Sequence, residues 1–328
     1  MLYIGCYTGA SGGHGTGVTA VRQTADGLSA VAEVALDSPS WLARHPTAPV
    51  MYAAVESDPG TVATIDLDAF AVTDSVPSGG ASPCHLSITA DVRFLLCANY
   101  AGGSLAVFGL TAEGQVTGRT DLVTHEGSGP DPERQEAAHV HMTVPLDTPQ
   151  GTLVSAVDLG TDEIRTYTLD GTGTLAHQAT SAMPPGTGPR QLLRHPGTDR
   201  AYVAGELGGT VITVREGPAG TFTPVGTTPA THTPWNDGPN YVAHLELVGE
   251  RLYVSNRGPD CVTEFDVSGA TPRAVADHPC GAFPRHFSIV DGVCHVAAQL
   301  GDAITSFPLT GGPASRFETG SPTCVIPG

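Results

Sequence analysis

Short apolar runs recur along the whole chain and are separated by turns rich in glycine, proline and aspartate. Within each run the apolar residues are mostly consecutive, as in Met51–Val55 and Phe94–Ala98, and no segment spaces them with the period of an amphipathic helix. Short apolar runs flanked by turn residues are typical of β-strands. The pattern therefore predicts an all-β protein built from many short strands.

These runs belong to a unit that recurs seven times. Each unit has a first strand, a second strand that ends in a polar residue, and a third strand after a turn. The first strands begin with Pro39–Leu42, Pro83–Leu86, His139–Met142, Pro189–Leu192, Val242–Leu245, Pro284–Phe287 and Pro322–Val325. The second strands end at Tyr7, Glu56, Tyr100, Asp158, Glu206, Arg257 and Gln299. Seven units in 328 residues correspond to about 47 residues each, the length of a four-stranded propeller blade.

The two ends of the chain complement each other. The N-terminus begins with a second strand, Leu2–Tyr7, whereas the C-terminus ends with a lone first strand. A blade assembled from both ends would close the ring of blades and leave no open sheet edge. We therefore expect a single domain, residues 1–328, that folds as a seven-bladed β-propeller whose terminal strands share one blade.

The charge of the chain excludes several kinds of partner. It has 33 acidic residues and 15 basic ones, all of them arginine, which gives a net charge of −18. Binding of nucleic acids or of anionic membranes requires a basic surface, so neither partner is expected. Because the chain contains no lysine, chemistry that depends on a lysine Schiff base or a lysine nucleophile is also excluded.

Cysteine usage indicates a reducing compartment. The seven cysteines are odd in number, include no CxxC pair and lie mostly inside apolar runs, so we expect reduced thiols buried in the core. No apolar run is long enough to span a membrane, and the N-terminus starts as a strand without the pattern of a signal peptide. These features predict a cytoplasmic protein that needs neither a cofactor nor a metal.

Candidate chemistry gathers where the repeated strands turn. In an antiparallel hairpin the start of the first strand and the end of the second lie at the same end, so residues at these positions share one mouth of the propeller. The polar side chains found there are His85, Tyr100, His139, His141, Arg190, Glu206, His244, Arg257, Arg285 and His286. Arginine suits a small anionic ligand, and histidine or glutamate beside it can act as a general base.

A long loop, residues 125–138, leads to the same mouth and is a candidate binding loop. It carries Arg134 and Gln135 and is followed by His139 and His141. Alternation along a strand places these two histidines on one face if the strand is regular there. Which of the two faces a ligand is therefore left open.

Structural roles are alternatives for several of these residues. Arg190 and Glu206 belong to one blade and can form an ion pair without a catalytic role. His85 and His244 can be satisfied polar residues that cap the inner strands. The histidines come from different blades, so a shared metal ion is not expected.

Six motifs occur in order along the chain: Gly127–His141, Asp158–Asp162, Gly188–Arg190, Ala201–Leu207, Ser255–Gly258 and Pro284–Phe287. Together they resemble the propeller lactonase family, which includes bacterial 6-phosphogluconolactonases and fungal carboxy-cis,cis-muconate cyclases. The first motif is the most distinctive, and the resemblance covers essentially the whole chain. It implies a seven-bladed propeller with a metal-free site.

The resemblance also implies roles for individual residues. The catalytic set that it implies is His141, Arg190, Glu206 and Arg257. Arg134 and Gln135 match the loop that borders the site. The sequence departs from the family pattern at Gln191, at Ala137 and Ala138, and at Gly205. These departures leave the four catalytic positions intact and put the identity of the substrate in doubt.

Three functions fit these residues. The first is hydrolysis of a small anionic lactone of a sugar acid or phosphosugar, with His139, His141 or Glu206 as general base and arginine stabilising the oxyanion. The second is a lactonising cycloisomerase that uses the same side chains for proton transfer to or from carbon. The third is a propeller that binds a ligand or serves as a scaffold without catalysis. The residues favour the first function and leave the exact substrate and the oligomeric state open.

Overall fold

The computed structural model describes residues 1–25 and 27–328. Within these segments the regular structure consists of β-strands and three short 3-10 turns, η1 (Gly9–Ser11), η2 (Pro218–Gly220) and η3 (Gln299–Gly301), with no α-helix. The described part of the chain accordingly contains no helix of the length and apolarity needed to cross a membrane. The prediction of an all-β protein is confirmed.

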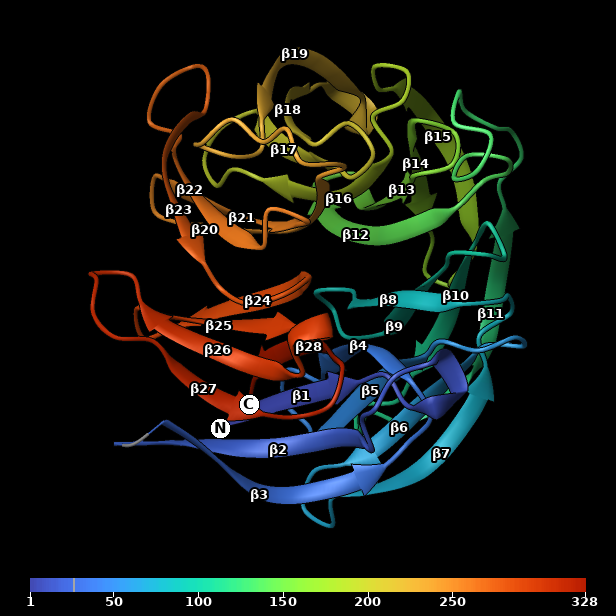
Figure 1. The fold of residues 1–328 in the computed structure, drawn as a ribbon. Helices are drawn as coiled ribbons and strands as arrows, with labels where there is room; N and C mark the ends of the chain where they lie inside the picture. Colours follow the sequence, from blue (N-terminus) through green and yellow to red (C-terminus); the bar gives the residue numbers. More distant parts are fainter. Residues whose placement is uncertain (26) are drawn as a thin grey trace. The chain divides into compact units, whose positions relative to one another are not determined.

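The strands of the described residues form seven four-stranded sheets, as the repeat predicts. Within the sheets the strands follow the orders β28-β1-β2-β3, β4-β5-β6-β7, β8-β9-β10-β11, β12-β13-β14-β15, β16-β17-β18-β19, β20-β21-β22-β23 and β24-β25-β26-β27. Each sheet thus pairs strands that are neighbours in sequence, apart from the one that contains β28 (Figure 1).

Contacts divide the described residues into two compact units. The first unit comprises Met1–Ser40, Ala204–Thr213 and Gly226–Gly328, and the second comprises Trp41–Val203 and Val214–Val225. The first unit holds β1 (Leu2–Cys6), β2 (Gly17–Thr24), β3 (Gly27–Ala35), β20 (Tyr241–Val248), β21 (Arg251–Arg257), β22 (Cys261–Asp266), β23 (Arg273–Pro279), β24 (Pro284–Val290), β25 (Val293–Ala298), β26 (Ala303–Pro308), β27 (Ser315–Glu318) and β28 (Pro322–Pro327).

The second unit holds the strands from the middle of the chain. They are β5 (Val50–Val55), β6 (Thr61–Asp66), β7 (Ala71–Pro77), β8 (Pro83–Ile88), β9 (Phe94–Asn99), β10 (Ser104–Leu110), β11 (Val116–Thr124), β12 (Val140–Thr148), β13 (Gly151–Asp158), β14 (Glu163–Leu169), β15 (Leu175–Ala182) and β16 (Pro189–Arg194). Residues of both units contribute to β4 (Pro39–Arg44), β17 (Arg200–Gly205), β18 (Thr210–Glu216) and β19 (Phe222–Pro229).

The first and last strands of the chain lie in one sheet. β28 pairs with β1 in an antiparallel register that places Tyr3 opposite Ile326. The amide of Gly328 also donates to the carbonyl oxygen of Met1 at 3.0 Å, and Figure 1 shows the two termini side by side. The expectation that the terminal strands share one blade is confirmed.

The inner strands are apolar at consecutive positions because both of their faces are buried. On β9, Leu95 packs in one apolar cluster with Tyr52, whereas the next residue, Leu96, packs in another with Val140 and Val154. Successive side chains of a strand point to opposite faces, and a fully buried leucine contributes about 1.5–3 kcal/mol. An uninterrupted apolar run therefore marks a strand that is covered on both sides.

The cysteines behave as core residues. All seven are buried thiols outside any disulfide, and burial raises the pKa of Cys6 and of Cys261 to about 12. Because the thiolate is the reactive form, we expect no thiol of the folded protein to react with an aromatic disulfide reagent within minutes at pH 8. All seven should react after unfolding in guanidinium chloride, and a fast-reacting thiol in the folded protein would contradict this prediction.

Glu246 on β20 makes the stability of the fold depend on pH. Its side chain is half-buried and accepts the amide of Ile289 on β24 at 3.1 Å. Burial raises the pKa of Glu246 to about 7, although the hydrogen bond from Ile289 acts in the opposite direction. The folded state therefore disfavours the ionised form of Glu246. Below the unfolded pKa the side chain is protonated in both states, so it does not lower the free energy of unfolding. The cost develops as the pH rises from about 4.5 towards 7 and is complete above that range.

We therefore expect Glu246→Gln, which keeps an acceptor oxygen without the charge, to stabilise the protein at pH 8. The expected gain in the free energy of unfolding is on the order of 2 kcal/mol, and the gain should vanish near pH 4.5, where the unfolded glutamate is half protonated. Urea unfolding of both proteins at the two pH values measures the difference. An equal effect at both values would rule out titration of Glu246 as its source.

Candidate functional site

The predicted site residues fall into two sets, one in each compact unit. The histidine set, in the second unit, consists of His85, Tyr100, Arg134, Gln135, His139, His141 and Arg190. The glutamate set, in the first unit, consists of Glu206, His244, Arg257, Arg285 and His286. Most of these polar side chains are buried and the others are half-buried. Buried polar groups require specific partners or a ligand, so each set has to be understood through its contacts.

A β-bulge recurs where the first strands of the blades begin. The register of β12 on β13 shifts at His141. Corresponding shifts occur on β20 between Val242 and Leu245, and on β24 at Arg285. A bulge inserts an extra residue and re-aims its side chain. Since the strand is irregular at His141, the condition under which His139 and His141 would share one face is not met.

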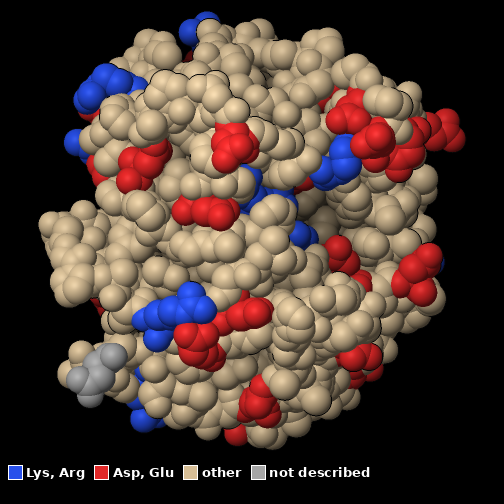
Figure 2. Space-filling model, in the orientation of Figure 1, with Lys and Arg blue, Asp and Glu red and all other residues tan. Residues whose placement is uncertain are grey.

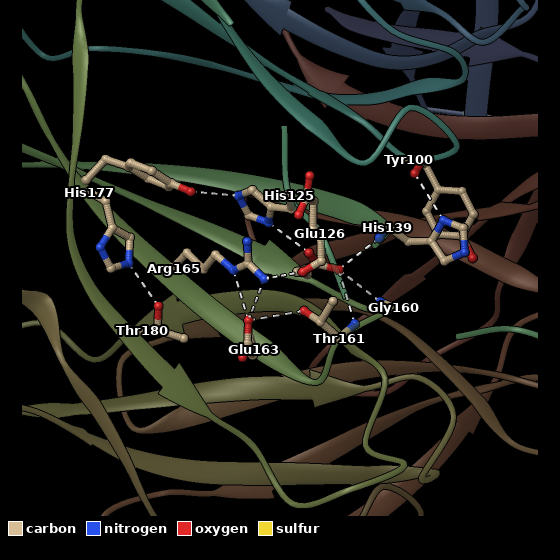
Figure 3. A network of polar contacts seen from close by, with 12 residues as sticks. Tyr100, His125, Glu126, His139, Gly160, Thr161, Glu163, Arg165, His177 and Thr180 are labelled. Atoms are coloured by element: carbon tan, nitrogen blue, oxygen red, sulfur yellow. Dashed lines mark hydrogen bonds and ion pairs between the residues drawn. The ribbon is translucent and has the colours of Figure 1, made fainter. Parts of the chain in front are cut away.

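His139 is engaged through its ring face and through both ring nitrogens. The ring stacks on that of Tyr100, with centroids 4.4 Å apart and an angle of 9° between the planes (Figure 3). Nδ1 lies 3.1 Å from the carbonyl oxygen of Tyr100, and Nε2 lies 3.2 Å from a carboxylate oxygen of Glu136. Both ring nitrogens therefore face acceptor oxygens. This geometry suits a brace at the end of the loop better than a general base.

Tyr100 also contacts two other members of the histidine set. The ring of His141 meets the Tyr100 ring edge-on, with centroids 5.7 Å apart. Nη2 of Arg134 donates to the Tyr100 hydroxyl at 3.4 Å. One aromatic ring thus helps to place both the loop arginine and the histidine in the bulge.

His85 is buried and stays uncharged. Its ring centroid lies 4.4 Å from that of Trp41, and its Nδ1 accepts the amide of Thr143 at 3.4 Å. Burial, and then the charge of Arg190, lower the pKa of His85 to about 3. His85 can therefore offer a neutral imidazole to a ligand but does not exchange a proton near neutral pH.

Gln135 is fully buried and braces the loop from inside. Its Nε2 donates to the carbonyl oxygen of Leu159 at 2.8 Å, and its Oε1 accepts the amide of Asp131 at 3.2 Å. Both ends of the side-chain amide are thus used by backbone groups. The side chain of Gln135 therefore shapes the loop that borders the site.

Glu206 and Arg257 form a buried ion pair in the glutamate set. Oε2 of Glu206 lies 2.7 Å from Nη2 of Arg257, and the two side chains are only 4% and 6% exposed. Nε of Arg257 donates to the carbonyl oxygen of Tyr241 at 3.0 Å, and the guanidinium lies 5.1 Å from the ring centroid of Phe283. These contacts orient the cation and, through it, the carboxylate. Within the first compact unit, Glu206 is therefore the anionic partner of Arg257.

Ring contacts organise the rest of the glutamate set. The rings of His244 and His286 have centroids 3.9 Å apart, and the guanidinium of Arg285 lies 5.1 Å from the centroid of Tyr7. Nδ1 of His286 accepts the amide of Val325 at 3.3 Å. In the neutral ring the hydrogen is therefore on Nε2, which makes that atom a donor.

The charges of these residues favour an anionic ligand. Figure 2 shows acidic side chains spread over one face of the protein and fewer arginines, in keeping with the net charge of −18. Arg190 and Arg257, in contrast, are buried cations. Their guanidinium groups can bind a carboxylate or a phosphate. Across residues 1–25 and 27–328, no three His, Cys, Asp or Glu side chains are grouped as ligands of a metal ion would be.

Similarity to known proteins extends over nearly the whole chain. The model of the family described as "Lactonase, 7-bladed beta-propeller" matches residues 1–327. A 6-phosphogluconolactonase of Bacillus subtilis is 33% identical over 240 residues, which cover 71% of this chain and 68% of that protein.

Two solved structures extend the comparison. The periplasmic gluconolactonase of Pseudomonas aeruginosa matches with a TM-score of 0.89 and 26% identity, over 99% of this chain and 98% of its own. A protein from Lactobacillus plantarum matches with a TM-score of 0.88 and 27% identity, over the same shares of the two chains. These matches confirm the seven-bladed propeller and the family resemblance of the motifs: the chain belongs to the seven-bladed β-propeller lactonase family.

Proposed function

We propose that this protein hydrolyses a small lactone that carries an anionic group, such as the lactone of a sugar acid or of a phosphosugar. Family membership supports lactone hydrolysis as the reaction class. Two similar proteins are described as a 6-phosphogluconolactonase and a gluconolactonase, and the first of these names implies an anionic substrate. The observation that carries the proposal is the buried Glu206–Arg257 pair, because it joins a proton acceptor to a fixed cation.

In the proposed mechanism Glu206 is the general base and His141 is the competing candidate. The base takes a proton from water, and the water oxygen attacks the lactone carbonyl carbon. The carbonyl oxygen becomes an oxyanion, which the guanidinium group of Arg257 beside Glu206 stabilises. The ring C–O bond then breaks, the base returns its proton to the leaving oxygen, and the product is an open hydroxy acid. No step uses a metal ion or a cofactor.

The other members of the two sets bind and orient the substrate in this proposal. His85 stays neutral because of its low pKa, so it contributes a hydrogen bond without competing for the transferred proton. Arg134 on the loop contributes a charge for the carboxylate or phosphate of the substrate. Selectivity for anionic lactones is expected to depend on these local cations, since the net charge of −18 repels anions at longer range.

Base uptake at constant pH on a panel of lactones tests the proposal. The panel contains 6-phosphogluconolactone, gluconolactone and an uncharged lactone without hydroxyl groups, and the spontaneous rate is subtracted for each. Turnover above background with 6-phosphogluconolactone preferred over the two uncharged lactones is the expected result. Wild-type turnover in a double variant, Glu206→Gln with Arg190→Ala, would overturn the assigned roles.

The same panel separates the other two functions. If no lactone is hydrolysed, product analysis with unsaturated dicarboxylic acids tests the cycloisomerase, which makes or opens a ring without net uptake of water. Tight binding of anions without turnover of either kind would indicate a ligand-binding protein.

A cytoplasmic location is part of the proposal. It is supported by the seven cysteines, which form no disulfide in the structure, because thiols persist in a reducing compartment. Fractionation of cells that produce the protein tests this location, and recovery outside the cytoplasm would refute it.

A further inference from the structure

One buried carboxylate holds both ends of the loop between β11 and β12. The loop begins at His125 and ends at His139. Oδ2 of Asp158 lies 2.7 Å from Nδ1 of His125, and Oδ1 accepts the backbone amide of His139 at 2.8 Å. The side chains of Asp158 and His125 are fully buried. Two residues that are far apart along the loop are therefore joined through one side chain at the end of β13.

Further donors hold this carboxylate in place. Oδ1 of Asp158 also accepts the amides of Gly160 at 3.0 Å and Thr161 at 3.2 Å, and Figure 3 shows the donors converging. Nε2 of His125 lies 2.9 Å from the hydroxyl of Tyr167 on β14. Burial alone would raise the pKa of Asp158, but the hydrogen bonds from His125 and from the amide of His139 bring it below its usual range. Asp158 is therefore an ionised acceptor at neutral pH.

The residue after Asp158 attaches the same loop at two more points. The carbonyl oxygen of Leu159 accepts Nε2 of Gln135 at 2.8 Å, and its amide donates to the carbonyl oxygen of His139 at 2.9 Å. The start, the middle and the end of the loop are thus all fixed to Asp158 and Leu159. The conformation of Arg134, which lies next to Gln135, depends on this attachment.

We propose that Asp158 is a positioning residue that clamps both ends of the loop and thereby sets the affinity for the anionic group of the substrate through Arg134. Its kinetic consequence rests on the proposed function. The conformational order of the loop, in contrast, can be measured without any substrate.

The clamp predicts a change in KM that exceeds the change in kcat. Asp158→Ala removes the acceptor for both ends of the loop, so Arg134 loses its fixed position and KM should rise by about tenfold or more. His141 lies on β12, which stays paired with β13, so kcat should change by less than about threefold. A purely structural role would give the opposite result, since a smaller folded fraction lowers apparent kcat and leaves KM unchanged.

Asp158→Asn tests the same idea with a side chain of equal shape. Its carboxamide oxygen can still accept the backbone amides, and its Nδ2 can donate to the other tautomer of His125. We expect a partial rescue, with KM between those of the wild type and the alanine variant. This variant also keeps the proposal testable if Asp158→Ala does not fold.

Hydrogen exchange of peptides that cover residues 126–138 measures the loop directly. Exchange should be fastest in Asp158→Ala, intermediate in Asp158→Asn and slowest in the wild type. Asp170→Ala is the matched control, because Asp170 is an exposed carboxylate of the same sheet that accepts the amides of Thr172 at 2.8 Å and Thr174 at 3.0 Å in a turn. It should leave both KM and the exchange of the loop unchanged.

The two readouts separate the clamp from the proposed function. Unchanged KM and unchanged exchange of the loop in both Asp158 variants would overturn the clamp, whatever the wild type hydrolyses. Faster exchange of the loop in a protein that hydrolyses no lactone would support the clamp and overturn the proposed function.

Discussion

Glu206→Gln is expected to lower kcat for the best lactone substrate by about 100-fold or more, the usual effect of removing a general base. The amide is close in shape to the carboxylate but cannot take a proton from water. The variant also leaves Arg257 without its charged partner, so part of the loss arises from a guanidinium that is less well oriented. Base uptake at constant pH measures the rate, and circular dichroism verifies that the variant is folded.

Glu264→Gln is the matched control for this experiment. Glu264 lies on β22 in the same compact unit, is only 16% exposed and faces Arg251 at 3.6 Å, but it belongs to neither candidate set. Its loss should change kcat by less than about twofold. If Glu206→Gln is as active as this control, Glu206 is not the base, and His141→Asn becomes the decisive variant.

Gly160→Ala is expected to produce the largest loss of stability among substitutions near the loop. A Cβ atom on Gly160 would lie 1.9 Å from the carbonyl oxygen of Ala137 and 2.8 Å from the amide nitrogen of His139. Both are backbone atoms, which cannot rotate away, so the end of the loop has to move. We expect the free energy of unfolding to fall by about 3 kcal/mol and the exchange of residues 126–138 to accelerate.

Gly171→Ala provides the comparison for this prediction. Gly171 lies in a turn of the same sheet, and the atom nearest to an added Cβ would be Nη1 of Arg93, at 3.8 Å. This substitution should change the free energy of unfolding by less than about 0.5 kcal/mol. Equal urea midpoints for the two variants would mean that the backbone of Ala137 and His139 does not crowd Gly160 in solution.

Glu206 and Gly160 differ in how far the sequence could point to them. Glu206 ends a second strand of the repeat and belongs to a family motif, so the sequence alone singled it out. Gly160 lies within another of the motifs, but its crowding depends on Ala137, which is distant along the chain. No local pattern reports such a contact.

The same distinction applies to the candidate site. The identities of most of the side chains at the strand ends could be derived from the repeat, because antiparallel pairing places equivalent positions at the same end. Their partners could not be derived in this way. The ion pair of Glu206 with Arg257 links the ends of two strands from different sheets, and no repeat pattern in the sequence reports such a contact.

The sequence by itself determined the all-β class, the number of four-stranded sheets and the pairing of the terminal strands, because these features follow from the spacing of apolar runs and turns. Only the tertiary structure decided the bulge at His141, the bracing role of Gln135 and the clamp at Asp158. The physical reason is the range of the interactions. Burial of a strand on both faces is visible locally as a run of apolar residues that recurs along the chain. A register shift and the hydrogen bonds of a buried carboxylate depend on groups that only the folded chain brings together.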